Sequence, residues 1–302
     1  MFREALRYLR TALSRSEIDA GTEAMTAQSS ARARPPAAAA EPALLRENVG
    51  NIAVLTLNRP QARNSLSEAM LAGLSQELEN IAVDKRVRAV VVAARGAAFS
   101  AGHDLKELTA HRADPDGGRS YTRQIMERCS AVMLALRRLP QPVIAAVEAT
   151  ATAAGCQLVA TCDLAVASTT AKFSTPGVHI GLFCSTPMVA LSRNVGRKHA
   201  MEMLLTGDMI SAEDACRFGL VNRVVEPGTA REEALKLARK IATKSAAVVK
   251  LGKEAFYRQL EMDVADAYQY ATEVMVQNMM ARDAEEGIAA FVEKRQPTWK
   301  DR

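Results

Sequence analysis

From Asn51 to about Val225, short apolar runs alternate with longer segments whose apolar residues recur every three or four positions. The short runs have the length of strands, and the longer segments have the helical period. The predicted strands are residues 52–57, 87–94, 143–147, 163–167 and 221–225. The predicted helices are residues 65–83, 120–139, 154–162 and 211–219, with capping boxes at Ser65-Leu-Ser-Glu68 and Ser211-Ala-Glu-Asp214. Strands separated by helices predict parallel βαβ units and an α/β fold.

Both ends of the chain differ from this alternating middle. The helical period continues without strands over residues 229–302, which predicts a C-terminal helical region that serves packing or assembly. Residues 1–45 contain an amphipathic segment with arginines and then an alanine- and proline-rich stretch, 31–42. This leader is either a disordered extension or a transit peptide, and its acidic residues count against a transit peptide. The predicted domains are therefore the leader, a core over residues 46–228 and the helical region, and the expected compartment is the cytoplasm, with the mitochondrial matrix as the alternative.

The composition is that of a globular protein. Apolar residues make up 48% and charged residues 24% of the 302 residues, which excludes collagen-like, coiled-coil and mucin-like chains. No apolar run reaches the roughly 18 residues of a membrane span, so no membrane partner is expected. The net charge of +5 comes from 39 basic and 34 acidic residues, and aromatic residues make up only 4%. We therefore expect no nucleic-acid partner, although the mild positive charge favours an anionic small molecule.

The cysteines and histidines do not form a metal-binding motif. The five cysteines include no CxxC pair, and the four histidines include no HExxH motif. An odd number of cysteines is typical of buried thiols in a reducing compartment. Cys156 and Cys184 lack evident His and Asn partners for nucleophilic catalysis, so inert thiols are expected. We therefore expect no metal site.

Three common ligand-binding motifs are missing from the sequence: the GxGxxG of dinucleotide-binding folds, the GxxxxGK[ST] of P-loop proteins and the GxSxG of serine hydrolases. Two turns rich in small residues remain, 99–107 and 150–157, each between a predicted strand and a helix. Small residues let a ligand approach the backbone, and a helix N-terminus presents free N–H groups. The two turns either form an oxyanion hole from backbone N–H groups or only permit tight packing.

The string Phe99-Ser-Ala-Gly-His-Asp-Leu-Lys-Glu107, with Ala154-Gly-Cys-Gln-Leu-Val-Ala-Thr-Cys-Asp163 after it, resembles the crotonase, or enoyl-CoA hydratase/isomerase, superfamily. Further matches follow in order along residues 48 to 302: Leu57-Asn-Arg-Pro60 with Asn64, Leu205-Thr-Gly207, Ile210-Ser-Ala212, Gly219-Leu-Val221 and Gly287 to Arg295. The resemblance implies a crotonase-like spiral of ββα units in two stacked sheets, and a helical C-terminal region that assembles a homotrimer or hexamer. It also implies acyl-CoA thioesters as ligands, with no separate cofactor because CoA is part of the substrate.

The resemblance also assigns roles to single residues. Carried over by position, the backbone N–H groups of Ser100 and Ala154 would form the oxyanion hole; Ala154 stands where the family usually has glycine, which a backbone donor tolerates if φ stays negative. Residues at the positions that bind CoA, mostly through the main chain, are Ala62, Ala101, Gly102, His103 and Asp104. Hydratases of the family carry two catalytic glutamates where this chain has Gln157 and Gly177, and some members carry an aspartate at the position of Ser185.

These replacements remove the general acid and base of ordinary hydration but leave oxyanion stabilisation intact. Gln157 can orient a water molecule but cannot take its proton. The sequence therefore indicates an enoyl-CoA hydratase-like protein of acyl-CoA and fatty-acid metabolism. The alternatives are decarboxylation of a malonyl-type CoA ester, thioester hydrolysis, and acyl-CoA binding without catalysis. His103 is a candidate for binding a substrate carboxylate and His179 for replacing the missing acid or base, and each is otherwise a structural side chain.

Overall fold

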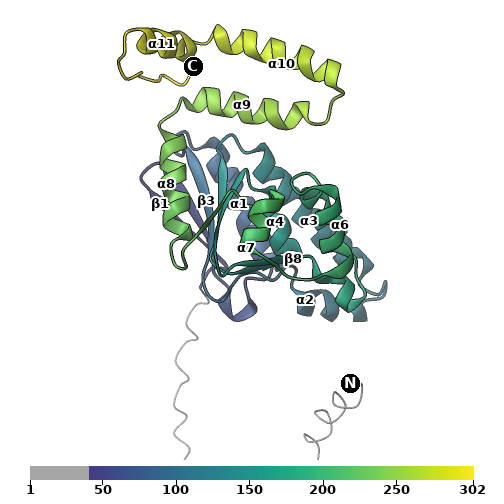
Figure 1. Ribbon diagram of the computed structural model, residues 1–302. Coiled ribbons are helices and arrows are strands. Elements are labelled where there is room, and N and C mark those ends of the chain that lie inside the picture. Colours follow the sequence, from purple (N-terminus) through teal and green to yellow (C-terminus); the bar gives the residue numbers. More distant parts are fainter. Residues whose placement is uncertain (1–40) are drawn as a thin grey trace, which may run out of the picture. The chain divides into compact units, whose positions relative to one another are not determined.

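Two β-sheets organise residues 41–302, which are the residues that the computed structural model describes (Figure 1). The larger sheet has the order β1-β2-β3-β5-β7-β10, with β1 Leu44–Val49, β2 Ile52–Leu57, β3 Ala89–Ala94, β5 Val143–Val147, β7 Leu164–Ser168 and β10 Arg223–Val225. The smaller sheet has the order β4-β6-β8-β9, with β4 Ala98–Ser100, β6 Thr150–Thr152, β8 Lys172–Ser174 and β9 Ile210–Ser211. Only β1 and β9 pair antiparallel with their neighbours. The carboxyl ends of β4, β6 and β8 therefore lie at one edge of the smaller sheet.

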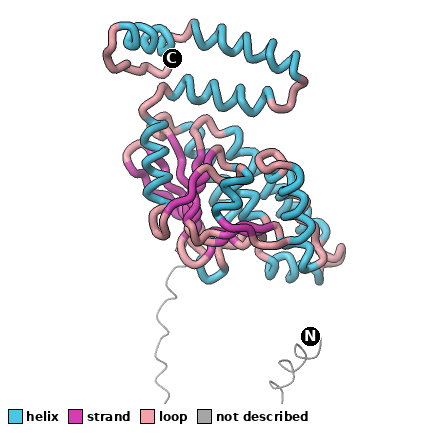
Figure 2. Tube along the Cα trace, viewed as in Figure 1, coloured by secondary structure: helices cyan, strands magenta, loops and turns pink. Residues whose placement is uncertain are grey.

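Helices connect the strands of both sheets (Figure 2). The α-helices are α1 Glu68–Val83, α2 Leu105–Ala110, α3 Arg119–Arg138, α4 Ala154–Thr161, α5 Pro187–Leu191, α6 Arg197–Thr206, α7 Ala212–Phe218, α8 Ala230–Ala242, α9 Ala246–Gln259, α10 Val264–Met279 and α11 Arg282–Val292. The 3-10 helices are η1 Pro60–Ala62, η2 His111–Ala113 and η3 Pro176–Ile180. The N-cap of the capping box predicted for α7 is confirmed, because the hydroxyl of Ser211 accepts a hydrogen bond from the N–H of Asp214 at 3.0 Å.

The larger sheet is buried on both faces, and β3 shows how its sequence achieves this. Val90 and Val92 belong to one apolar cluster, whereas Val91 belongs to the other, because successive side chains of a strand point to opposite faces. Helices α1, α3 and α4 contribute to the first cluster and α8 to the second. A mostly parallel sheet between helices is an α/β fold, as the alternating pattern predicted.

The start of α1 differs from the predicted capping box. The side chain of Ser67, rather than that of Ser65, accepts the hydrogen bond from the N–H of Met70, at 3.2 Å. The hydroxyl of Ser65 instead donates to Oδ2 of Asp104 at 3.0 Å. Ser65 therefore connects the start of α1 to the first of the two turns rich in small residues.

The C-terminal helices form two groups. Helix α8 packs on the larger sheet through Ala230, Ala234 and Leu235, so the predicted boundary after residue 228 separates the last strand from a helix that covers the core. Helices α9, α10 and α11 lie together beyond that sheet (Figure 1). They expose large apolar side chains, among them Phe256, Val264, Tyr268, Met280, Phe291 and Val292. Among the helices of residues 41–302, none combines the length and the apolar character needed to cross a membrane. Residues 1–40, which hold most of the predicted leader, lie outside the described residues.

Candidate active site

The two turns rich in small residues meet at the carboxyl edge of the smaller sheet. A Cβ added to Gly155 would overlap the carbonyl oxygen of Ser100 and lie 2.7 Å from the Cβ of Ser100. A Cβ added to Gly102, whose φ is +89°, would lie 3.1 Å from the backbone nitrogen of Ala154. The structure therefore brings Ser100 and Ala154 together, and glycine at position 155 is required for this approach.

The backbone N–H of Ala154 is available at this meeting point. Helix α4 begins at Ala154, so this N–H has no carbonyl partner inside the helix. Within residues 41–302 it donates to no other group. The positive φ of 50° falls on the preceding residue, Ala153, where an L-residue is strained, whereas Ala154 itself has no positive φ. Alanine at position 154 is thus compatible with an N–H that points out of the helix end, where partial positive charge favours an anion.

The predicted CoA-binding residues gather beside Ser100. Ala101 and Gly102 follow it directly, and the N–H of Ala101 donates to the carbonyl of Arg63 at 3.0 Å. The carbonyl of Gly102 accepts from the N–H of Leu66 at 2.7 Å. These two bonds hold the segment that contains Ala62, in η1, against the first turn. Residues 62–66 and residues 101–103 are distant in sequence, but these bonds place the two backbone segments side by side next to the meeting turns.

Asn64 fixes this segment, a role that sequence reasoning missed. Its side chain is fully buried, with Oδ1 accepting from the N–H of Arg59 and Nδ2 donating to the carbonyls of Arg95 and Ala98, each at 2.8 Å. Arg63 and Asn64 have φ values of 50° and 51°, a conformation in which asparagine is common. The sequence analysis used Asn64 only as one of the residues that match the family. Two of its three hydrogen-bond partners, Arg95 and Ala98, are more than 30 residues away, so local sequence could not predict these bonds.

Asp104 holds the start of α2. Its carboxylate accepts hydrogen bonds from the hydroxyl of Ser65 at 3.0 Å and from the N–H of Lys106 at 3.1 Å, and Nη1 of Arg59 lies 3.3 Å away. Burial raises the pKa of Asp104, but these hydrogen bonds and the Arg59 charge together outweigh burial and lower it. The carboxylate is therefore ionised and engaged within the protein, which makes Asp104 a positioning residue of the first turn.

His103 has no such partners. Both of its ring nitrogens are buried and make no hydrogen bond within residues 41–302. Burial lowers the pKa of His103, and the backbone of Leu66, beside the ring but outside hydrogen-bond geometry, opposes the shift only partly. The imidazole is therefore neutral at neutral pH, with one N–H donor and one acceptor unused.

At positions 157 and 177, where the resemblance implied a missing pair of glutamates, the structure shows a buried amide and a glycine without room for a side chain. Gln157 is 5% exposed, and its Oε1 has no hydrogen-bond partner within residues 41–302. A Cβ added to Gly177 would lie 2.8 Å from the carbonyl oxygen of Leu182 and 3.0 Å from Sγ of Cys184. Cys184 thus occupies the space into which a side chain at position 177 would extend.

Cys156 and Cys184 are buried, whereas the remaining candidates, His179 and Ser185, are exposed. Burial raises the pKa of Cys156 to about 12 and also raises that of Cys184, which supports inert thiols. His179 is exposed and lies against Gly207, where an added Cβ would be 2.8 Å from its Nε2. Ser185 is exposed and its hydroxyl donates to the carbonyl of Phe183 at 3.3 Å. Within the described part of the chain, no group of three or more His, Cys, Asp or Glu side chains is placed to hold a metal ion.

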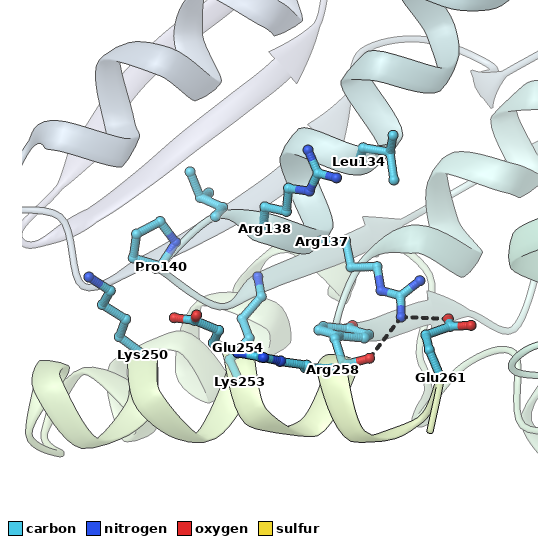
Figure 3. A pocket seen from close by; sticks show the side chains of 11 residues that line it. Leu134, Arg137, Arg138, Pro140, Lys250, Lys253, Glu254, Arg258 and Glu261 are labelled. Carbon is cyan, nitrogen blue, oxygen red and sulfur yellow. Dashed lines mark hydrogen bonds and ion pairs between the residues drawn. The ribbon is translucent and has the colours of Figure 1, made fainter. Parts of the chain in front are cut away.

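A cavity of about 690 Å³ lies elsewhere, between α3 and α9 (Figure 3). Arg137 donates there to Oε1 of Glu261 at 3.0 Å and to the carbonyl of Tyr257 at 3.1 Å, as the dashed lines show. Behind it, Nζ of Lys253 contacts Oδ2 of Asp163 at 2.7 Å. None of the residues of the two turns lines this cavity, and its charged side chains connect α9 to the core.

The comparison with known proteins identifies the family of this chain and its fold. The family model for enoyl-CoA hydratase/isomerase matches residues 47–302. The chain belongs to the enoyl-CoA hydratase/isomerase family. It is 48% identical over 269 residues to the enoyl-CoA hydratase domain-containing protein 3, mitochondrial, of Rattus norvegicus, a match that covers 88% of each chain.

Solved structures of the family agree with this assignment. An enoyl-CoA hydratase of Mycobacterium smegmatis is 55% identical, with a TM-score of 0.82 over 86% of this chain and 99% of that chain. The human enoyl Coenzyme A hydratase domain-containing protein 3 is 47% identical, with a TM-score of 0.81 over 85% of this chain and 100% of that chain. The resemblance to the crotonase superfamily and the predicted fold class are confirmed.

Proposed function

We propose that the protein binds acyl-CoA thioesters and polarises the thioester carbonyl with the backbone N–H groups of Ser100 and Ala154. The observation that carries this proposal is the contact between Gly155 and Ser100, because it brings the free N–H at the start of α4 beside the end of β4. Membership of the enoyl-CoA hydratase/isomerase family supports a CoA thioester as the ligand. The protein would then act in acyl-CoA and fatty-acid metabolism.

The chemistry of such a site follows from its donors. When a CoA thioester reacts through an enolate, negative charge develops on the carbonyl oxygen. Two fixed N–H donors and the positive end of a helix stabilise that charge, and the loss of one such donor typically lowers turnover by about 10² to 10³-fold. No side chain has to change its protonation state for this stabilisation.

Hydration of an enoyl-CoA additionally needs groups that move protons. Gln157 and Gly177 provide no carboxylate, and general acid–base catalysis typically contributes about 10² to 10⁴-fold. We therefore expect an enoyl-CoA hydratase-like protein with a working oxyanion hole and slow hydration. Cleavage of the thioester by water and binding without turnover are the other outcomes that this reduced site allows.

A second candidate activity is the decarboxylation of a malonyl-type CoA ester, and His103 favours it. Its neutral ring has an unused N–H donor close to Ser100 in sequence, and such a donor can hold a substrate carboxylate. The bond between the α-carbon and the carboxylate breaks, carbon dioxide leaves, and the electron pair enters the thioester enolate. The oxyanion hole holds the enolate oxygen, and the α-carbon then takes a proton from water.

The exposed apolar side chains of α9 to α11 fit an assembly of several copies. Phe291 and Met280 are 85% and 78% exposed, and apolar surface of this kind is usually covered in a stable protein. We propose a homotrimer or hexamer, which light scattering on the purified protein would identify by mass. The relative from Rattus norvegicus is named as mitochondrial, which supports a mitochondrial location, the alternative to the expected cytoplasm.

A product survey by mass spectrometry tests the proposed function. The purified protein is incubated with crotonyl-CoA, methylmalonyl-CoA and a medium-chain acyl-CoA, each beside a control without protein. Addition of water to crotonyl-CoA, loss of carbon dioxide or release of free CoA identifies the reaction. Ser100→Pro, which removes one donor N–H, should lower the rate of that reaction by about 10² to 10³-fold, and an unchanged rate refutes the role of Ser100.

A further inference from the structure

The cavity of about 690 Å³ between α3 and α9 carries more positive than negative charge (Figure 3). Its volume lies within the range of roughly 300 to 1,000 Å³ that is common for small-molecule sites. Five of its lining side chains are cationic and two are carboxylates. Asp163, behind the lining, neutralises one more cation, Lys253. An excess of two positive charges remains, and a cavity lined by charge of one sign attracts ligands of the opposite sign.

Two of the five cations are fully engaged within the protein. Arg137 donates to the carboxylate of Glu261 at 3.0 Å. Nζ of Lys253 gives its three N–H donors to Asp163 at 2.7 Å and to two backbone carbonyls at 3.1 Å. These two side chains attach α9 to the core, so a ligand in the cavity depends on the other three cations.

The side chains of Arg138, Lys250 and Arg258 make no ion pair and no hydrogen bond within residues 41–302. Arg258 only lies over the ring of Tyr270, at 4.7 Å. The last turn of a helix favours a cation, which accounts for Arg138 in α3 and Arg258 in α9. Lys250 is the fifth residue of α9 and gains no such stabilisation. Its position in the cavity therefore has no explanation within the protein.

The carboxylate of Glu254 does not neutralise these cations. Glu254 is four residues from Lys250 and four residues from Arg258 on α9, a spacing at which helix side chains can pair. It forms an ion pair with neither of them within residues 41–302. A single carboxylate also carries too little charge for two cations, so this side of the cavity stays positive.

We propose that the cavity binds a small organic phosphate, with the phosphate group among Arg138, Lys250 and Arg258. A phosphate monoester carries nearly two negative charges at neutral pH, which matches the excess charge of the cavity. Its oxygens accept charge-assisted hydrogen bonds from arginine and lysine. A carboxylate, with a single charge, would neutralise only half of the excess.

The remaining lining accounts for the organic part of the ligand. Leu134, Leu139 and Pro140 contribute apolar surface to the same cavity, and the cavity is too large for inorganic phosphate alone. Because the lining comes from both α3 and α9, a bound ligand holds α9 against the core. This site is separate from the two turns, so the inference does not depend on the proposed binding of acyl-CoA.

Calorimetry with phenyl phosphate on the full chain tests the site. Phenyl phosphate combines a doubly charged phosphate with an apolar ring, so it should bind more tightly than inorganic phosphate. Arg138→Gln and Lys250→Gln, one from each helix, should each weaken its binding by about 5- to 10-fold, as expected for the loss of one charge-assisted hydrogen bond. Glu254→Gln removes a negative charge from the lining and should strengthen binding.

Lys240→Gln is the matched control. Lys240 is exposed on α8 and does not line the cavity, so this variant loses the same charge elsewhere and should keep the affinity of the wild-type protein. Urea unfolding without ligand checks that the variants are folded. Arg138→Gln and Lys250→Gln should keep the wild-type midpoint, because neither side chain has a partner within residues 41–302.

Three results would overturn the inference. Phenyl phosphate may fail to bind at millimolar concentration, or it may bind no better than inorganic phosphate. Equal affinities in the wild-type protein, Arg138→Gln and Lys250→Gln would place the ligand elsewhere, and its displacement by butyryl-CoA would then assign it to the proposed acyl-CoA site. A failure of butyryl-CoA to bind refutes the proposed function alone, so the two proposals fail separately.

Discussion

The carbonyl group of Ser100 lies against the Cα of Gly155, and no room is left between them for a Cβ. Ser100 ends β4 and Gly155 is the second residue of α4, so this single contact fixes the end of a strand against the start of a helix. The distance between the two proposed N–H donors depends on it. Position 155 is therefore the most sensitive point of the proposed oxyanion hole outside the donors themselves.

Gly155→Ala should disrupt the hole. The added methyl group would overlap the backbone of Ser100, so β4 and α4 must separate, and we expect a loss of about 1 to 3 kcal/mol in the free energy of unfolding. Turnover of the acyl-CoA substrate should fall by at least about 10²-fold. The control is Gly252→Ala in α9, where nothing lies within 4 Å of an added Cβ; it should gain about 1 kcal/mol in helix stability. Equal turnover in both variants would contradict the account.

Gln157→Glu and Gly177→Glu should differ sharply in hydration of crotonyl-CoA. A carboxylate at position 157 can take the proton that the amide cannot, so the rate should rise by about 10²-fold over the wild-type protein. Gly177→Glu should instead lose stability, because Cys184 and the carbonyl of Leu182 occupy the space of its side chain. Gly177→Ala controls for the steric effect. A rate gain from Gly177→Glu alone would show that this region opens more easily than the structure indicates.

The buried His103 predicts an acid-sensitive stability. Burial lowers the pKa of His103 in the folded state, whereas the unfolded chain titrates near the ordinary value of about 6.5. Below that pH the unfolded state binds a proton that the folded state does not, so this contribution to stability is present above about pH 6.5 and is lost as the pH falls. His103→Gln should remove that part of the pH dependence in urea unfolding at pH 7.5 and 5.5. An identical pH dependence in both proteins would disprove the prediction.

Lys253→Met should be strongly destabilising although it lies far from the two turns in sequence. Nζ of Lys253 donates to Oδ2 of Asp163 at 2.7 Å and to the carbonyls of Leu136 and Gln141 at 3.1 Å. Its side chain is only 8% exposed, so its removal leaves Asp163 without its counter-charge, at a cost of about 3 kcal/mol or more. Lys250→Met, on the exposed side of the same helix, should change the midpoint of urea unfolding little.

The pattern of apolar residues was sufficient to predict the longer strands and helices that form the core, as β5 shows. The strand predicted over residues 143–147 is β5, residue for residue, because five apolar residues stand between Pro142 and Glu148. The three-residue strands β4, β6 and β8 carry too short a pattern to be recognised. The predicted helix start at Ser65 was wrong, because Ser67 is an equally good N-cap residue and is the one that caps α1. The hydroxyl of Ser65 instead bonds to Asp104, which is too distant in the chain for a local pattern to show.

Some parts of the candidate site could also be predicted from the sequence, and others could not. The two turns could be found from their small residues, and Ser100 and Ala154 could be assigned from the family resemblance. The obstruction of Gly177 by Cys184 depends on a loop that folds back on η3, and no local pattern encodes it. The cations around the cavity between α3 and α9 likewise come from helices that are distant in the chain.

The polarisation of a bound thioester carbonyl tests the central claim most directly. Infrared difference spectroscopy with crotonyl-CoA labelled with ¹³C at the thioester carbonyl reports the hydrogen bonds to that oxygen, whether or not any reaction follows. The account predicts that the carbonyl stretch moves to lower frequency on binding to the wild-type protein, and that this shift is lost in Gly155→Ala. A bound ester whose carbonyl stretch stays at its frequency in water would contradict the oxyanion hole of Ser100 and Ala154.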